Sequence, residues 1–153
     1  MKALVLILLL SISSFATEKP QALLDSISQY AIRIGDGSTN NIYVFVDPMC
    51  MHSQNYIEDI TKNKKLHKVN SYYIFLYRLP KFDSEELIQF IYQSKNPKLA
   101  LQEIMIENKE VDTFYLTASE KTLKMIEEIA LVGKKLKAEH RPFIIKLPIV
   151  KKP

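Results

Sequence analysis

Cys50 is the only cysteine in this chain of 153 residues. It follows the apolar run at residues 42–46 and the turn residue Pro48, and it precedes a segment with helical patterning. A thiol at a helix N-terminus faces unpaired backbone N–H groups and the positive end of the helix dipole. Both favour the thiolate, the form that attacks disulfides and binds soft metals. The placement therefore predicts a reactive cysteine, whereas a lone thiol inside an apolar helix would be a small core residue.

A copper site is an alternative use of the same cysteine. Met49 and Met51 flank Cys50, and His52 follows, so thioether, thiolate and imidazole groups stand in consecutive positions. Soft sulfur ligands with an imidazole are what Cu(I) prefers, and His140 is a further candidate ligand. Consecutive helix residues point in different directions, so both methionines cannot face the same ion. The alternative metal set is therefore Cys50, His52 and His140, with no cofactor expected under the preferred interpretation.

The first sixteen residues have the pattern of a secretory signal. Lys2 precedes an apolar run at residues 3–10, and Ser14 and Ala16 are the small residues that a signal peptidase requires. The apolar run is too short to span a bilayer comfortably. We expect cleavage after residue 16 and export to the periplasm, with a mature chain that does not span the membrane. An uncleaved N-terminal anchor is the alternative.

Composition excludes several classes of function. The chain has 21 Lys and Arg against 17 Asp and Glu, a formal net charge of +4. Its lysine clusters lack the interleaved aromatic residues or glycine-rich loops of a nucleic-acid site, so no nucleic-acid partner is expected. Neither the paired carboxylates of a glycosidase, nor a Ser/His/Asp order, nor zinc-ligand spacing is present. We expect a monomer that folds without an internal disulfide.

The hydrophobic patterning predicts alternating helices and strands that would position Cys50. Strand patterns precede Cys50 and recur near residue 75, and a third follows Pro142. Capping-box patterns at Asp83 and at Thr117 predict two helix starts. The expected elements are a helix at 21–32, a turn at 35–38, a strand at 42–46, a helix at 50–62, a strand at 71–77, helices between 83 and 138, and a strand at 142–147. This order predicts an α/β fold with parallel pairing, in which Cys50 lies beyond the carboxyl end of a strand.

Residues 43–53, Tyr-Val-Phe-Val-Asp-Pro-Met-Cys-Met-His-Ser, resemble the Val-Phe-x-Asp-Pro-x-Cys-x-x-Cys segment of the thioredoxin-fold disulfide isomerases of the DsbC/DsbG type. Leu79-Pro80 after the second strand, Asn-Pro-Lys-Leu-Ala-Leu at 96–101 and Arg-Pro-Phe-Ile-Ile at 141–145 continue the likeness. It covers roughly residues 40–147. The resemblance implies a thioredoxin-like domain at 41–153, after an N-terminal helix and turn at 17–40, with a helical insertion at about 83–138.

The resemblance also implies an activity, which is thiol–disulfide exchange with protein or small-molecule thiols and disulfides. Cys50 would be the nucleophile, and Pro142 would follow a cis peptide bond and orient the substrate chain. Arg141 would stabilise the thiolate and His52 would tune it.

Two departures from the family limit this expectation. Ser53 stands where the family has its second cysteine, and Arg141 stands where it usually has threonine. A serine hydroxyl cannot resolve a mixed disulfide as a second thiolate does. Cys50 would then support isomerase or glutathione-type exchange without net oxidation, or would itself carry a protective adduct. A degenerate thioredoxin-fold protein that binds a partner without catalysis is a further alternative.

Overall fold

Two parallel strands form the centre of the sheet in the computed structural model, which describes residues 18–149. β2 (Asn40–Val46) and β3 (Asn70–Leu76) pair in parallel along their whole length. β1 (Ile32–Ile34) adds antiparallel to β3, and β4 (Phe143–Pro148) adds antiparallel to β2. The sheet order is therefore β1-β3-β2-β4. The expected signal peptide at residues 1–16 lies outside the described residues.

Side chains of the central strands alternate between two hydrophobic cores. Ile42, Val44 and Val46 of β2 lie in one core, and Tyr43 and Phe45 lie in the other. All five are at most 7% exposed, so both faces of the sheet are covered. This explains why β2 reads in the sequence as a continuous apolar run and not as an alternating one.

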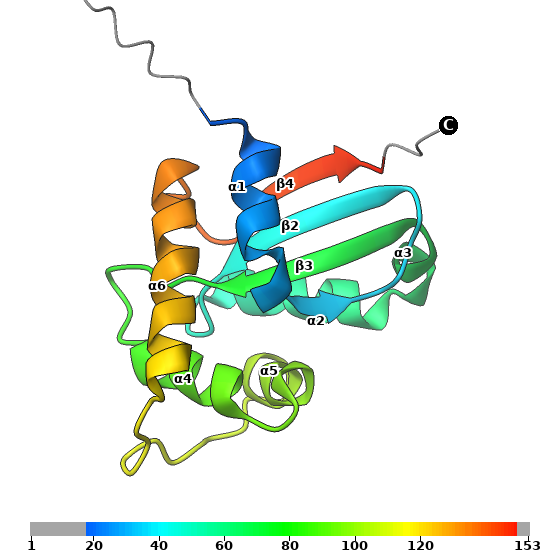
Figure 1. Ribbon diagram of the computed structural model, residues 1–153. Coiled ribbons are helices and arrows are strands. Elements are labelled where there is room, and N and C mark those ends of the chain that lie inside the picture. The colour runs from blue at the N-terminus through cyan, green and yellow to red at the C-terminus, as the bar shows by residue number, and fades with distance from the viewer. Residues whose placement is uncertain (1–17, 150–153) are drawn as a thin grey trace, which may run out of the picture.

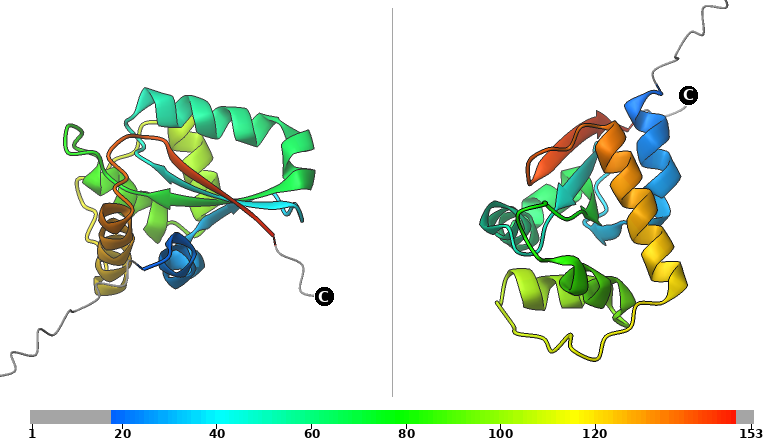
Figure 2. Two further views of the ribbon diagram at one scale, coloured as in Figure 1. Left: turned by 90° about the horizontal axis from the view of Figure 1, so that it is seen from above. Right: turned by 90° about the vertical axis from the view of Figure 1, so that its left-hand side faces the viewer.

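Helices cover the two faces of the sheet (Figures 1 and 2). α2 (Met51–Lys62), α4 (Glu85–Gln93) and α5 (Pro97–Met105) supply one core. α1 (Pro20–Ile27) and α6 (Glu120–Lys135) lie side by side and supply the other. The short helices are η1 (Ser28–Tyr30) and α3 (Lys64–Val69). None of the helices within residues 18–149 is long and apolar enough to cross a membrane.

The predicted order of elements is confirmed, with an α/β fold and three helices inserted between β3 and β4. The prediction for residues 21–32 is wrong in part, because α1 ends at Ile27 and β1 begins at Ile32. β1 pairs with β3, so the segment before residue 41 contributes a strand to the sheet.

Side chains cap two of the three helices between β3 and β4. At α5 the Asn96 side chain accepts a hydrogen bond from the Leu99 N–H at 3.1 Å, with Pro97 in the first turn. The prediction of a cap at Thr117 is wrong, because Ser119 caps α6 and accepts from the Thr122 N–H at 3.1 Å. The prediction at Asp83 is displaced by one residue, since Ser84 is the N-cap of α4.

Candidate thiol site

Three strand ends meet at the edge of the sheet that holds the thiol. β2 and β3 are parallel, so their carboxyl ends lie together, and antiparallel β4 brings its first residues to the same edge. Cys50 follows β2, Tyr77 follows β3, and Arg141 and Pro142 precede β4. In α/β sheets this edge is where reactive and binding residues gather.

Cys50 is the N-cap of α2, as its sequence context predicts. Its backbone N–H donates to the Asp47 carbonyl at 3.0 Å, which closes the turn through Pro48. Its carbonyl accepts the first bond of the helix, from the Gln54 N–H at 2.9 Å. Only 5% of the residue is exposed, and the thiol is not part of a disulfide.

The thiol faces the loop that leads into β4. Cys50 Sγ lies 3.8 Å from the carbonyl oxygen of Arg141 and is oriented to donate to it. The Arg141–Pro142 peptide bond is cis, as the resemblance implied. The Cys50 turn and the loop before β4 therefore lie together as predicted, although they are about ninety residues apart in the chain.

A pocket of about 430 Å³ opens at the thiol. Both histidines of the alternative copper set line it together with the cysteine. The lining residues are Cys50, His52, Leu79, Pro80, Lys81, Glu139, His140 and Arg141. Among the described residues, however, no three His, Cys, Asp or Glu side chains are close enough to hold a metal ion together.

Ser53 is placed differently from the pocket residues. It lies one turn into α2 and is fully buried, and its hydroxyl accepts a hydrogen bond from the Asp47 N–H at 3.3 Å. The hydroxyl therefore fastens the first turn of α2 to the end of β2.

Asp47 holds the site together, and sequence reasoning did not single it out. The residue is completely buried, and one carboxylate oxygen accepts from the Met49 N–H at 2.9 Å. The other accepts from the Leu79 N–H at 2.6 Å and the Ser84 hydroxyl at 2.9 Å. One side chain thus ties the cysteine turn, the loop after β3 and the start of α4. The available signal was an acidic residue directly after an apolar strand and before proline.

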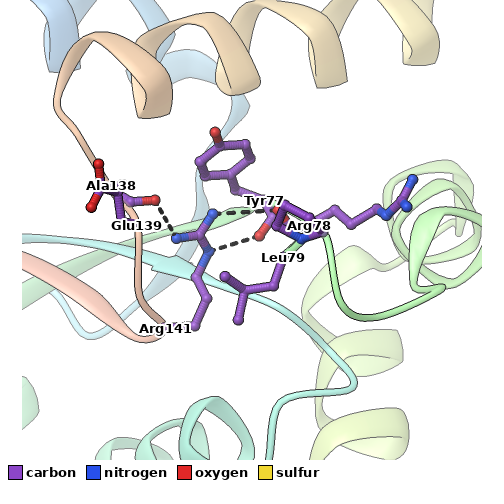
Figure 3. A pocket seen from close by; sticks show the side chains of 7 residues that line it. Tyr77, Arg78, Leu79, Ala138, Glu139 and Arg141 are labelled. Atoms are coloured by element: carbon purple, nitrogen blue, oxygen red, sulfur yellow. Dashed lines mark hydrogen bonds between the residues drawn. The ribbon is translucent and has the colours of Figure 1, made fainter.

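The guanidinium of Arg141 is held by backbone carbonyls. It donates to Tyr77 O at 2.8 Å, to Ala138 O at 2.7 Å and more weakly to Arg78 O at 3.4 Å (Figure 3). It also donates to His140 O at 2.7 Å. It also stacks on the Tyr77 ring, 4.0 Å from the ring centre. Removal from water lowers the pKa of Arg141 from its ordinary value, although a guanidinium stays protonated at neutral pH. The arginine contacts Cys50 through its main chain, and its role toward the thiolate stays a prediction.

The Tyr77 ring rests in turn on Gly133 of α6. A Cβ built on Gly133 would lie 2.5 Å from the ring, closer than carbon atoms can approach. Sequence reasoning missed both residues, because this contact depends on how α6 crosses the end of β3. Gly133, Tyr77 and Arg141 form a stack that links α6 to the loop facing the thiol.

Comparison with protein-family models and with the curated proteins finds no match. Solved structures do match in fold. The catalytic domain of Proteus mirabilis ScsC superimposes with a TM-score of 0.65 and 16% identity, over 84% of this chain and 86% of that one. A disulfide interchange protein from Neisseria gonorrhoeae superimposes with a TM-score of 0.59 and 16% identity, over 76% of this chain and 79% of that one. Helicobacter pylori DsbG gives 0.62 and 16%, over 84% of this chain and 60% of that one. The chain therefore has the thioredoxin-like fold that its sequence predicted.

Proposed function

We propose that this chain is an exported thiol–disulfide exchange protein that uses Cys50 as its single nucleophile. The observation that carries the proposal is the position of the Cys50 sulfur. It lies at the N-terminus of α2, in a pocket, and 3.8 Å from the carbonyl of the residue before the cis-proline. The structures that share the fold include a disulfide interchange protein and a thiol-disulfide exchange protein from Wolbachia pipientis, which supports the same chemistry here.

The reaction conserves the number of disulfides. The Cys50 thiolate attacks one sulfur of a substrate disulfide, forms a mixed disulfide with it, and releases the other sulfur as a thiolate. A different thiolate of the substrate then attacks the substrate sulfur of the mixed disulfide, since attack by the thiolate just released would only restore the original disulfide. Cys50 leaves unchanged and a new substrate disulfide forms. Ser53 cannot resolve the intermediate, so the site favours isomerisation and exchange over net oxidation.

The roles of the neighbouring residues follow from their places around the sulfur. The Arg141 carbonyl faces the sulfur, and together with Pro142, which follows in a cis peptide bond, it would align the bound chain. His52, which is exposed and lines the pocket, would exchange a proton with the leaving sulfur, as donor or as acceptor. Export to the periplasm, as the signal pattern at residues 1–16 predicts, would bring the thiol into an oxidising compartment where disulfides persist.

The proposal is tested by trapping the mixed disulfide. Reduced protein is mixed with glutathione disulfide, and the intact mass is followed with time. We expect one glutathione adduct to form on the folded chain faster than on the chain unfolded in urea, and none to form on Cys50→Ser. Equal rates in the folded and unfolded states would instead support the alternative of a binding protein without catalysis.

Cu(I) binding is a second candidate, supported by the presence of Cys50, His52 and His140 around one pocket. A Cu(I) competition titration on the reduced protein separates it from exchange chemistry. We expect weak binding that barely changes in Cys50→Ser and His140→Ala. Tight binding that is lost in both variants would favour copper.

A further inference from the structure

A second pocket, of about 570 Å³, adjoins the Cys50 pocket (Figure 3). The two share Leu79, Pro80, Glu139 and Arg141 among their lining residues. Together they form one groove, called here the Cys50 groove. Residues 77–81 form one wall, residues 138–141 form the other, and Cys50 lies at one end.

Positive charge predominates along the Cys50 groove. Arg78 and Lys81 are exposed on one wall, and Arg141 lies on the other. His52 and His140 stand near the thiol and add charge when protonated. Of the residues that line the groove, all within the described part of the chain, only Glu139 is acidic.

Two of these cations have an acidic neighbour within the protein, but neither pairing is a close one. Arg78 meets Glu85 at 3.4 Å, but both side chains are about half exposed, and such a pair contributes little. Arg141 is only 6% exposed as a residue; within residues 18–149 it forms no ion pair with Asp or Glu, although the charge of the buried Asp47 carboxylate favours its protonated form. Its partners are carbonyl oxygens, which carry no net charge. An anion in the groove would therefore interact with Arg141 through its charge, because most of its N–H donors are already bonded to carbonyl oxygens.

We propose that the Cys50 groove selects disulfides flanked by acidic residues, that is, extended peptide segments with carboxylates close to the reacting sulfur. This inference rests on the proposed exchange function and specifies its substrate. The carboxylates would lie beside Lys81 while the disulfide reaches Cys50, and Arg78, whose guanidinium donates to the Phe82 carbonyl at 2.9 Å, would act through longer-range attraction (Figure 3). Electrostatic attraction of this kind acts chiefly on the rate of encounter and weakens with salt.

Three peptides with one activated disulfide test the inference. Each carries a single cysteine as a mixed disulfide with 2-thiopyridine, flanked by glutamates, by glutamines or by lysines. The Cys50 thiolate forms a disulfide with the peptide sulfur, and the bond to the thiopyridyl sulfur breaks. Pyridine-2-thione leaves and its absorbance gives the rate constant. The leaving group is the same in all three, so the rates differ only through the flanking charges.

We expect the glutamate peptide to react roughly threefold to tenfold faster than the glutamine peptide, and the lysine peptide to react more slowly than both. Arg78→Gln and Lys81→Gln should each reduce the glutamate preference, while Glu139→Gln should increase it. Lys65→Gln, an exposed change on α3, is the matched control and should leave the preference intact. Added salt should bring the three rates together.

The outcomes separate the inference from the function on which it rests. If all three peptides react rapidly with Cys50 at one rate, or if Arg78→Gln and Lys81→Gln leave the preference unchanged, the acidic-substrate inference is overturned and exchange stands. If no peptide reacts faster with the folded chain than with the chain unfolded in urea, the proposed exchange function itself is lost.

Discussion

Ser53 marks the position at which a second thiol would resolve the mixed disulfide. It lies three residues after Cys50 at the start of α2, where side chains at this spacing are about 5–6 Å apart at Cβ. A disulfide needs a Cβ separation of about 3.5–4.5 Å, so a bond between positions 50 and 53 requires the first turn of α2 to tighten, as Cys-x-x-Cys redox sites do. The residue is fully buried, so a thiol there would be shielded from solvent, as Cys50 nearly is.

Ser53→Cys should therefore convert the chain into a dithiol protein. After oxidation we expect an internal disulfide, seen as the loss of the two thiol hydrogens in the intact mass, and a short-lived glutathione adduct. A glutathione redox titration would give its reduction potential. Ser71→Cys, which changes another buried serine at the start of β3, is the matched control and should give no internal disulfide. An adduct as long-lived in Ser53→Cys as in the original chain would contradict this geometry.

Asp47 is a second single residue on which the site depends, and its effect is on the stability of the folded chain. Its carboxylate accepts hydrogen bonds from two backbone N–H groups and one hydroxyl, all at the site. Asp47→Ala would leave these donors unsatisfied, and a buried donor without a partner costs about 1–3 kcal/mol. We expect the free energy of unfolding to fall by about 3 kcal/mol or more in urea denaturation. Asp36→Ala removes an exposed carboxylate and should change it by less than about 0.5 kcal/mol. Equal effects of the two variants would refute the role given to Asp47.

At the scale of elements, α6 is positioned against the end of β3 by a glycine. Glycine inside a helix is usually unfavourable by about 1 kcal/mol relative to alanine. Gly133 is nevertheless required here, because a Cβ at this position would enter the Tyr77 ring. The Tyr77 ring carries the Arg141 guanidinium, so the contact reaches the loop that faces Cys50.

Gly133→Ala should accordingly destabilise the protein, against the usual helix preference. We expect a lower melting temperature and a slower reaction of Cys50 with glutathione disulfide, because displacement of Tyr77 disturbs the Arg141 loop. In a Tyr77→Leu background the same change should cost much less, since the ring is gone. A double-mutant cycle measures this coupling. Additive effects of the two changes would show that the contact has no energetic importance.

Local signals in the sequence determine which elements could be predicted. β2 and β3 are apolar runs, so both were predicted closely, whereas α5 was expected only as one of the helices between residues 83 and 138. β1 is three residues long and continues the apolar spacing of α1, so periodicity extended the helix over it. Only pairing with Tyr72, Tyr73 and Ile74 of β3 makes that segment a strand.

The site was predicted only in part, because some of its contacts form only when distant parts of the chain come together. Cys50, its helix and the cis-proline loop follow from local sequence and from the family resemblance. The environment of Arg141 does not, because its carbonyl partners come from the loop after β3 and the end of the helical insertion. The groove likewise exists only when those two loops meet, so the charges that line it could not be predicted from the order of residues in the chain.

Buried tyrosines link the stability of the whole molecule to alkaline pH. Burial raises the pKa of the Tyr43 and Tyr92 phenols above the ordinary value, and it raises the pKa of Tyr56 to about 12. Tyr92 lies on α4, and its hydroxyl oxygen accepts from the Leu76 N–H at 2.9 Å. An unfolded tyrosine ionises near pH 10. The folded pKa values are higher, so the stability from these neutral phenols is fully present below about pH 10 and is lost as the pH rises through the folded values.

We therefore expect the free energy of unfolding, measured in urea, to decline between about pH 10 and 12. Tyr92→Phe removes the acceptor of the Leu76 N–H, so it should lower stability at pH 7 by about 1–2 kcal/mol. It also removes a group that ionises more readily when unfolded, so the alkaline decline should become shallower. Tyr115→Phe, a change on an exposed ring, should alter neither value, and it controls for the loss of a phenol hydroxyl as such. A decline of equal slope in all three proteins would exclude Tyr92 as its source.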